Sequence, residues 1–176
     1  MHLRMKRLNL LILLLSVFCM CLSCSKDDVD AIFDPANKDA IMPLDVSVVY
    51  GSQLTEAFND MSVAGAIFSR LSGGKVSAPT AYVLNDQNLL SGIQNKEGVE
   101  ISWPESMLSN YSLVVCCMSG CTRSFVNDQR IIVNKGKATL YIDFKRSVFQ
   151  DVRVFYNAYL FPKLPDGQVD VVVREN

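Results

Sequence analysis

Histidine is almost missing from this 176-residue chain, because the only one is His2. Every later residue therefore lacks the imidazole that Ser-His-Asp or Cys-His catalysis, histidine general-base chemistry and histidine-ligated zinc require. The chain also has no glycine-rich phosphate-binding loop, and no spacing singles out one pair of carboxylates for a glycosidase mechanism. We therefore expect a protein that is not an enzyme and that uses no cofactor.

No apolar run is long enough to cross a membrane, although the chain begins like an exported protein. Three basic residues precede the apolar stretch Leu8–Phe18. Even extended to Leu22, this stretch has about 15 residues, whereas a spanning helix needs roughly 20. It ends in Cys21-Leu22-Ser23-Cys24, which resembles a lipobox, where a cysteine is diacylated before cleavage. We expect residues 1–23 to be a cleaved lipoprotein signal peptide and Cys24 to carry the lipid.

The residues after Cys24 suggest where the protein is anchored. Ser25-Lys26-Asp27-Asp28 resembles the acidic export signal of Bacteroidota surface lipoproteins, although any solvated tether can be acidic. We therefore expect a lipid anchor in the outer membrane, on the cell surface in preference to the periplasmic face. Residues 24–43 are predicted to be the lipidated cysteine and a flexible tether. Such a tether would hold the domain on the order of 25 Å from the membrane.

Basic residues are not in excess. After the predicted signal peptide, 153 residues remain, with 14 basic and 18 acidic side chains. A nucleic-acid binder is normally basic, so we expect no nucleic acid among the partners. The segment from Thr122 to Arg153 has seven basic against three acidic residues. It could form a basic face for an acidic polymer or lipid headgroups, or consist of ordinary solvated strand faces.

Residues 44–176 are predicted to form a β-rich globular domain. It is mainly β (β-rich α+β), a single antiparallel domain with one or two short helices. Val152–Phe161 is apolar on both faces, which predicts a central strand. Pro165-Asp166-Gly167 predicts a hairpin turn, with Gly167 at positive φ, that pairs this strand with the edge strand Val169–Arg174. The other predicted strands are residues 45–50, 66–71, 76–84, 100–103, 112–118, 130–133 and 138–144, with helices at 53–61 and 86–93 and hairpin turns at 72–75 and 134–137.

Three phrases in the second half of the chain carry a resemblance. "NDQNLLSGI", "WPESMLSNYSLVV" and "FPKLPDGQVDVVV" occur between Ala81 and Val173, among predicted strands. This order is similar to a family of small lipoproteins with a protease-stabilising, PrcB-like C-terminal domain. The family usually has a Gly-Gly-Tyr-type turn after its central strand, where this chain has Cys116–Arg123. The resemblance implies a noncatalytic, partner-binding role and supplies no catalytic residue.

Cys116, Cys117 and Cys121 are the one cluster that could carry chemistry. Strong zinc patterns need four ligands, and the spacing is not that of a CxxC redox pair. Three interpretations remain: a disulfide to Cys121 across a turn at Met118–Gly120, three reduced and buried thiols, or a metal or redox site. We expect no metal.

The sequence therefore predicts an envelope lipoprotein that is a noncatalytic binding or accessory subunit and stabilises a protein partner at the membrane. The membrane is contacted through the lipid on Cys24, and Val169–Arg174 is the predicted edge to which a partner could add a strand. The alternative is a carbohydrate-binding accessory lipoprotein of a nutrient-uptake system. In that case the lone tryptophan, Trp103, could stack on a sugar ring, unless it is buried at a strand end.

Overall fold

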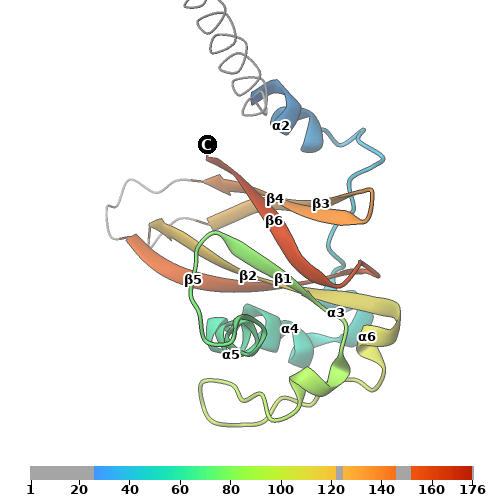
Figure 1. The fold of residues 1–176 in the computed structure, drawn as a ribbon. Helices are drawn as coiled ribbons and strands as arrows, with labels where there is room; N and C mark the ends of the chain where they lie inside the picture. The colour runs from blue at the N-terminus through green and yellow to red at the C-terminus, as the bar shows by residue number, and fades with distance from the viewer. Residues whose placement is uncertain (1–25, 122–124, 146–151, 176) are drawn as a thin grey trace, which may run out of the picture.

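The computed structural model describes residues 26–121, 125–145 and 152–175. The predicted signal peptide and the predicted lipid-bearing Cys24 lie outside the described residues, and so do Arg123 and Arg146 of the basic segment. The described residues form a curled six-stranded sheet, a half-barrel, with helices packed on one of its faces (Figure 1). This arrangement confirms the predicted β-rich class with short helices.

The strands are β1 (Thr80–Leu84), β2 (Tyr111–Cys121), β3 (Phe125–Asn134), β4 (Lys137–Lys145), β5 (Val152–Pro162) and β6 (Gly167–Glu175). The helices are α2 (Lys26–Ile32), α3 (Val46–Tyr50), α4 (Ser52–Asn59), α5 (Met61–Ser72) and α6 (Met107–Asn110), with a 3₁₀ helix, η1 (Gln87–Leu90). No helix within these ranges has the length and the apolar run needed to cross a membrane.

The order of the strands in the sheet is β3-β4-β6-β1-β2-β5. Neighbouring strands are antiparallel except β4 and β6, which are parallel, so the sheet is mainly antiparallel, as predicted, with one parallel pair that makes it mixed. β6 changes partner along its length: Gly167–Val169 pair with β1, and Asp170–Glu175 pair with β4. This change of partner joins two antiparallel groups of strands into one curled sheet.

Two strands lie elsewhere in the sheet than predicted. β5, predicted to be central, is at one end, and β6, predicted to be an edge strand, lies between β4 and β1. β5 is apolar on both faces because one face packs against α5 and the other lines the inside of the half-barrel. The predicted pairing of β5 with β6 across Pro165-Asp166-Gly167 is also wrong, since β6 pairs with β1 and β4. Gly167 does have a positive φ, 122°.

The hydrophobic core is divided by the sheet into two clusters. Successive residues of β2 alternate between them, as the pleat of a strand requires. Leu113, Val115 and Cys117 face the helices, whereas Val114, Cys116 and Met118 face the inside of the half-barrel. On the helix side, α5 buries four residues at helical spacing: Val63, Ala64, Ile67 and Phe68.

The largest differences from the predicted elements lie before β1. Residues 45–50 and 66–71, predicted to be strands, belong to helices α3 and α5. Asp45 and Asp60 each accept a hydrogen bond from the backbone N–H two residues later, so they cap these helices. Gly73, with φ 63°, ends α5 where a hairpin turn is predicted. Local capping therefore favours helix over strand in this region.

Later elements agree better with the prediction. The predicted helices 53–61 and 86–93 correspond to α4 and η1, and the predicted strand 112–118 lies within β2. The β3–β4 hairpin is confirmed, with positive φ angles of 51° at Lys135 and 78° at Gly136 in its turn. The predicted strand 76–84 begins only at Thr80, and residues 100–103 form no strand beyond a bridge between Gln94 and Glu100.

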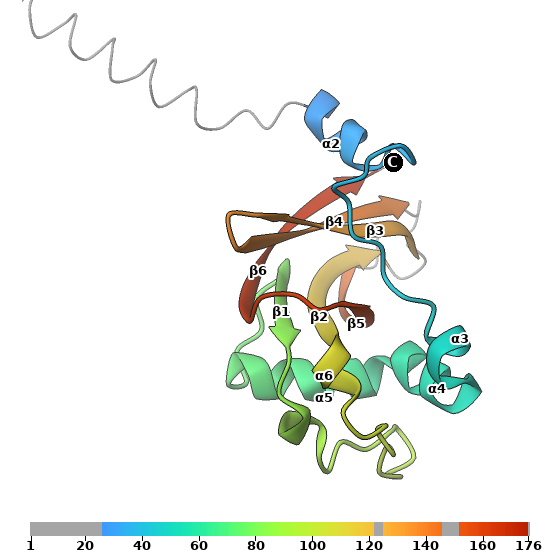
Figure 2. The same ribbon diagram turned by 90° about the vertical axis from the view of Figure 1, so that its right-hand side faces the viewer.

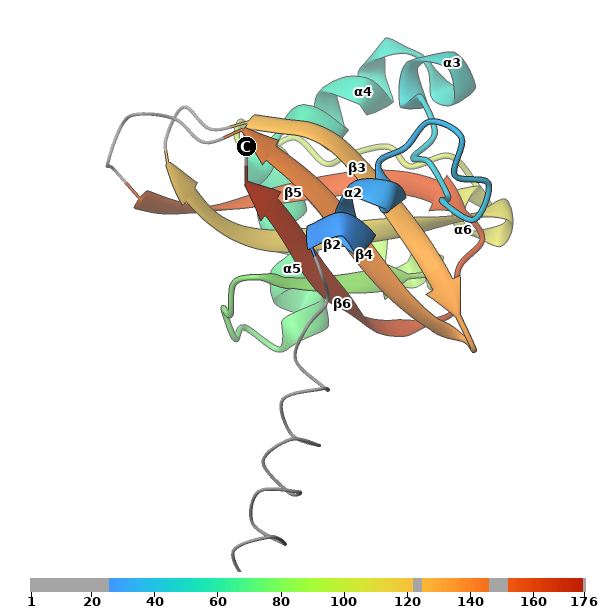
Figure 3. The same ribbon diagram turned by 90° about the horizontal axis from the view of Figure 1, so that it is seen from above.

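Residues 26–44, here called the N-terminal arm, are ordered against the sheet. The arm contains α2, which lies across the outer face of β4 and β6 when the molecule is viewed from above (Figure 3). From α2 the chain descends past β3 to α3 (Figure 2). The prediction of a flexible tether is therefore wrong for residues 26–43, and the contacts that hold them are described below.

Candidate functional site

The sheet is open between its two ends, β3 and β5, and this opening is here called the seam. The N-terminal arm crosses it. Ile41 exchanges two backbone hydrogen bonds with Ile131 of β3, at 2.8 and 3.0 Å. Three residues later, the N–H of Leu44 donates to the carbonyl of Leu160 in β5, at 2.7 Å. One end of the seam is thus bridged by the chain's own extended segment.

The remainder of the β5 edge has free backbone groups. The carbonyl of Leu160 points into the seam, and outward-pointing residues alternate along an antiparallel edge strand. Val154, Tyr156 and Ala158 therefore also direct their N–H and C=O groups away from β2. Within the described ranges, none of these groups has a hydrogen-bond partner. An extended segment of another chain could pair with them.

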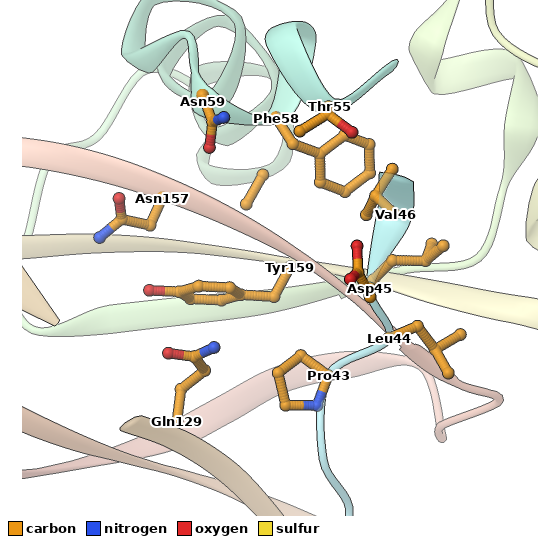
Figure 4. A pocket seen from close by; sticks show the side chains of 12 residues that line it. Pro43, Leu44, Asp45, Val46, Thr55, Phe58, Asn59, Gln129, Asn157 and Tyr159 are labelled. Carbon is orange, nitrogen blue, oxygen red and sulfur yellow. The ribbon is translucent and has the colours of Figure 1, made fainter. Parts of the chain in front are cut away.

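Beside this edge lies a cavity of about 340 Å³, here called the seam cavity (Figure 4). Its walls are residues 43–46, where the arm leads into α3, residues 157–160 of β5, Gln129 of β3, and the side chains of Thr55, Phe58 and Asn59 from α4. The cavity thus collects residues from four elements, and its lining extends from Pro43 to Leu160 in the sequence.

Three amide side chains point into the seam cavity. Asn59 approaches from α4, while the amides of Asn157 and Gln129 lie on either side of the Tyr159 ring (Figure 4). Within the described part of the chain, none of the three amides forms a hydrogen bond, although each has two donors and an acceptor. The two other polar side chains have partners: Thr55 donates to the carbonyl of Gly51, and Asp45 accepts from Ser47.

The seam cavity is weakly charged. Its one ionisable carboxyl is that of Asp45, whose pKa is lowered by hydrogen bonds from the Ser47 hydroxyl and backbone N–H. Burial, and then the nearby Cys116 thiol, raise the pKa of Tyr159 well above its ordinary value, so this phenol stays neutral at physiological pH. Of the described residues, no lysine or arginine lines the cavity. The site therefore suits neutral polar ligands better than anions.

The arm is held on the opposite, outer face of the sheet by two arginines. The guanidinium of Arg174 lies 4.2 Å from the centre of the Phe33 ring, and that of Arg130 lies 5.8 Å from it. Arg130 also donates to the carbonyls of Ile32 and Asp34, at 3.1 and 2.8 Å. These contacts fix the arm directly after α2.

Arg174 connects the arm to a buried acid. Its Nε donates to Asp143 at 2.9 Å, and its Nη1 donates to Asp30 of α2 at 2.7 Å. The Asp143 side chain is only 3% exposed, and it also accepts a hydrogen bond from Asn127. The hydrogen bond to Asp143 is the main reason that the pKa of Arg174 is raised. The arm therefore docks on a buried, charged cluster and not on an apolar patch.

The predicted cysteine cluster is divided by the sheet. Cys116 and Cys117 are free, buried thiols on opposite faces of β2. The predicted turn at Met118–Gly120 is absent, because β2 continues to Cys121 and pairs with β5 throughout. Along such a strand the Cα atoms of Cys117 and Cys121 are about 13 Å apart, beyond the roughly 7 Å limit for a disulfide. A disulfide to Cys121 would therefore require the end of β2 to unpair.

The environment of the two thiols disfavours nucleophilic chemistry. Burial raises the pKa of Cys116 to about 12. Burial also raises the pKa of Cys117, more than its hydrogen bond with Tyr156 lowers it. Both thiols therefore stay protonated at physiological pH. Among the described residues, no group of three or more histidines, cysteines or acids lies close enough to hold a metal ion.

The other predicted surface residues are not placed for binding. Trp103 is half-buried beside Phe58, with ring centres 6.3 Å apart, and its buried Nε1 has no hydrogen-bond partner in the part of the chain that the structure describes. It does not line the seam cavity. In the basic segment, Arg130 pairs with Asp128 at 2.9 Å and Lys137 with Asp170 at 2.6 Å. These pairs favour the interpretation of solvated strand faces over a free basic surface.

Sequence reasoning missed the three amides of the seam cavity. Asn59, Gln129 and Asn157 are distributed over the chain and share no motif. One signal was present in β5, where Asn157 interrupts an apolar face formed by Phe155, Tyr159 and Phe161. A lone amide on such a face indicates either a buried hydrogen bond or an opening to solvent, and here it faces a cavity.

Comparison with protein-family models, characterised proteins and solved structures found no match to this chain.

Proposed function

We propose that this protein is a lipid-anchored, noncatalytic envelope subunit that binds an extended segment of another protein along the free edge of β5. The observation that carries the proposal is the row of outward N–H and C=O groups at Val154, Tyr156 and Ala158. Pairing with such an edge gives a partner strand affinity through backbone hydrogen bonds and specificity through adjacent side-chain pockets.

The chain itself supplies a precedent for this mode of binding. Its extended segment from Ile41 to Leu44 already pairs with both edges of the seam. The β5 edge also lacks the features that commonly protect edge strands from pairing. It is eleven residues long, its only proline is the last residue, Pro162, and in its sequence Arg153 is the only charged residue. An edge of this kind supports a binding role.

The proposed anchor would hold this edge close to the membrane. We propose that residues 1–23 are removed and that Cys24 carries the lipid in the outer membrane. Asp30, six residues later, already contacts Arg174 on the domain. Six extended residues span at most about 20 Å, so the domain would lie near the lipid surface. A short anchor raises the local concentration of the β5 edge around neighbouring envelope proteins, which allows even a weak contact to be occupied.

The edge can be tested by one substitution that leaves the β2–β5 pairing intact. Because the N–H of Val154 points into the seam, Val154→Pro removes no hydrogen bond to β2 but blocks a strand on the other side. Val154→Thr is the matched control, since it keeps both the N–H and a β-branched side chain. Full-length protein carrying either substitution would be purified from native envelopes after cross-linking.

We expect a protein partner that is captured by wild type and by Val154→Thr and is lost with Val154→Pro. In the complex, hydrogen exchange of the amides of Val154, Tyr156 and Ala158 should slow. Equal capture by the proline variant would place the contact elsewhere and refute the proposed edge. A sedimentation result showing that wild type pairs with a second copy of itself through β5 would also refute binding to another protein there.

A further inference from the structure

We infer that the seam cavity is a binding site for one neutral saccharide unit. This inference is independent of strand addition at β5 and concerns side chains, not the backbone edge. It rests on the three amides of Asn59, Gln129 and Asn157, which point into one cavity with no hydrogen-bond partner among the described residues. Asn59 is exposed and Gln129 and Asn157 are half-buried, so water can reach all three amides, and a ligand in the cavity could replace that water.

The donor and acceptor pattern of the cavity matches hydroxyl groups. A carboxamide presents both an N–H donor and a carbonyl acceptor, and a sugar hydroxyl can donate to one and accept from the other. The carboxylate of Asp45 adds an acceptor, and Tyr159 adds a neutral phenol. The rings of Phe58 and Tyr159 supply apolar surface for the C–H groups of a sugar ring.

Size and charge narrow the ligand class. A volume of about 340 Å³ lies at the lower end of small-molecule sites, so it accommodates one ring and not a long chain. The absence of lysine and arginine from the lining, together with Asp45, disfavours phosphates and carboxylates. A neutral hexose or N-acetylhexosamine fits these limits. An uncharged polar side chain from a bound peptide is the competing occupant, and the test below separates the two.

The test uses the full-length protein in a detergent that contains no sugar headgroup. Methyl β-glucoside, methyl β-galactoside and N-acetylglucosamine are the neutral probes, and glucuronate is the anionic probe. We expect at least one neutral sugar to bind with a dissociation constant on the order of millimolar, as for other ligands of this size. Glucuronate should bind at least tenfold more weakly. In titrations followed by NMR, the side-chain amide signals of Gln129 and Asn157 should shift.

Two nearly isosteric variants remove the proposed contacts. Asn157→Leu and Gln129→Met keep the shape of each side chain but lose its hydrogen bonds, and each should weaken sugar binding at least tenfold. Gln168→Met, an exposed position on β6, makes the same chemical change away from the cavity and should leave binding unchanged. Val154→Pro should also leave it unchanged, which separates this inference from the proposed edge.

Several results would overturn the saccharide site. One is the absence of binding and of amide signal shifts with all three neutral sugars, which needs no variant and so does not depend on folding of the substituted chains. Another is binding that both amide variants retain at full affinity. Binding of an extended peptide that shifts the Gln129 and Asn157 amides, while no sugar does, would assign the cavity to a peptide side chain and would leave strand addition at β5 standing.

Discussion

β3 and β5 form the two ends of the same sheet, but the N-terminal arm makes different backbone hydrogen bonds with each of them. At β3 the arm exchanges two backbone hydrogen bonds through Ile41 and Ile131. At β5 it makes one such bond, from Leu44 to Leu160, and then leaves toward α3. The outward-pointing backbone N–H groups of Val154, Tyr156 and Ala158 have no hydrogen-bond partner among the described residues. The same type of strand edge is thus occupied by the chain's own residues at one end of the sheet and exposed at the other.

The difference shows how the molecule separates stability from binding. Ordering the arm costs conformational entropy, which its contacts must exceed. Those contacts are concentrated beside β3, where Phe33 lies against Arg174 and Arg130. In the seam cavity beside β5, the side-chain amides of Asn59, Gln129 and Asn157 have no hydrogen-bond partner among the described residues. We therefore hypothesise that the β3 edge contributes to stability and that the β5 edge contributes to binding.

The largest effect is expected from Arg174→Met. Without Arg174, the buried carboxylate of Asp143 loses its ion pair and hydrogen bond with this guanidinium. Removing one member of a buried pair is strongly destabilising, so the free energy of unfolding should fall by about 3 kcal/mol. Urea denaturation measures this change.

Lys137→Met is the matched control for that variant. The Lys137–Asp170 pair is also an ion pair on the outer face of the sheet, but its side chains are 68% and 56% exposed. Its loss should change the free energy of unfolding by less than about 0.5 kcal/mol. Similar losses in the two variants would show that the arm does not depend on a buried charge cluster.

A smaller effect is expected from Phe33→Ala, which removes the ring between the two arginines. We expect a loss of about 2 kcal/mol from the lost packing and cation–π contacts. The arm should then become sensitive to limited proteolysis, whereas the core strands should not. Phe33→Tyr keeps the ring and should keep the arm protected. If the arm of Phe33→Ala resists protease as well as that of wild type, the stacking does not hold it.

A further effect concerns the interior behind the β5 edge, where burial raises the pKa of Cys116 to about 12. An unfolded thiol titrates near pH 8.5, so above that pH the unfolded state releases a proton that the folded state retains. Stability should be unchanged by this thiol below about pH 8 and should fall by about 1.4 kcal/mol per pH unit between roughly pH 9 and 12. Urea midpoints at pH 7, 9 and 10 in wild type and Cys116→Ala test this. The variant should show a slope smaller by one proton, and an identical slope would mean that Cys116 is not the group responsible.

The sequence predicts local structure well where one face is buried and one is solvated. The alternation of Ala138, Leu140, Ile142 and Phe144 predicts β4, and Asn134–Lys137 predicts its turn. The same reasoning fails before β1, because short apolar runs are compatible with strand and helix, and the capping role of Asp45 and Asp60 depends on side-chain geometry.

Strand neighbours and the site are harder to predict than the strands themselves. The apolar sequence of β5 indicates that both of its faces are buried, but it does not indicate whether both of its edges are paired. The change of partner along β6 cannot be predicted from its composition. The sequence of the arm is polar and has no regular apolar period, because the arm is held by the ion pair of Asp30 with Arg174 and by one aromatic ring, Phe33. The amides of the seam cavity meet only after the sheet has curled, so no local spacing indicates them.

The comparison of the two edges can be tested directly, without changing the global stability, by amide hydrogen exchange. The backbone N–H of Ile131 points outward from β3 and donates to the carbonyl of Ile41. Those of Val154, Tyr156 and Ala158 point outward from β5 and have no hydrogen-bond partner among the described residues. We expect Ile131 to exchange at least ~100-fold more slowly than the three β5 amides, because local opening must first break its bond.

The alternation along β5 provides an internal control for this measurement. The backbone N–H groups of Phe155 and Asn157 point toward β2, so they should be protected from exchange although the N–H groups on either side of them point outward. In Phe33→Ala, exchange at Ile131 should accelerate, because the arm is released, while the pattern along β5 should not change. If Val154, Tyr156 and Ala158 in the isolated protein were instead as well protected as Ile131, the β5 edge would already be covered. No backbone groups would then be available there for a partner strand, and the functional difference between the two edges would not exist.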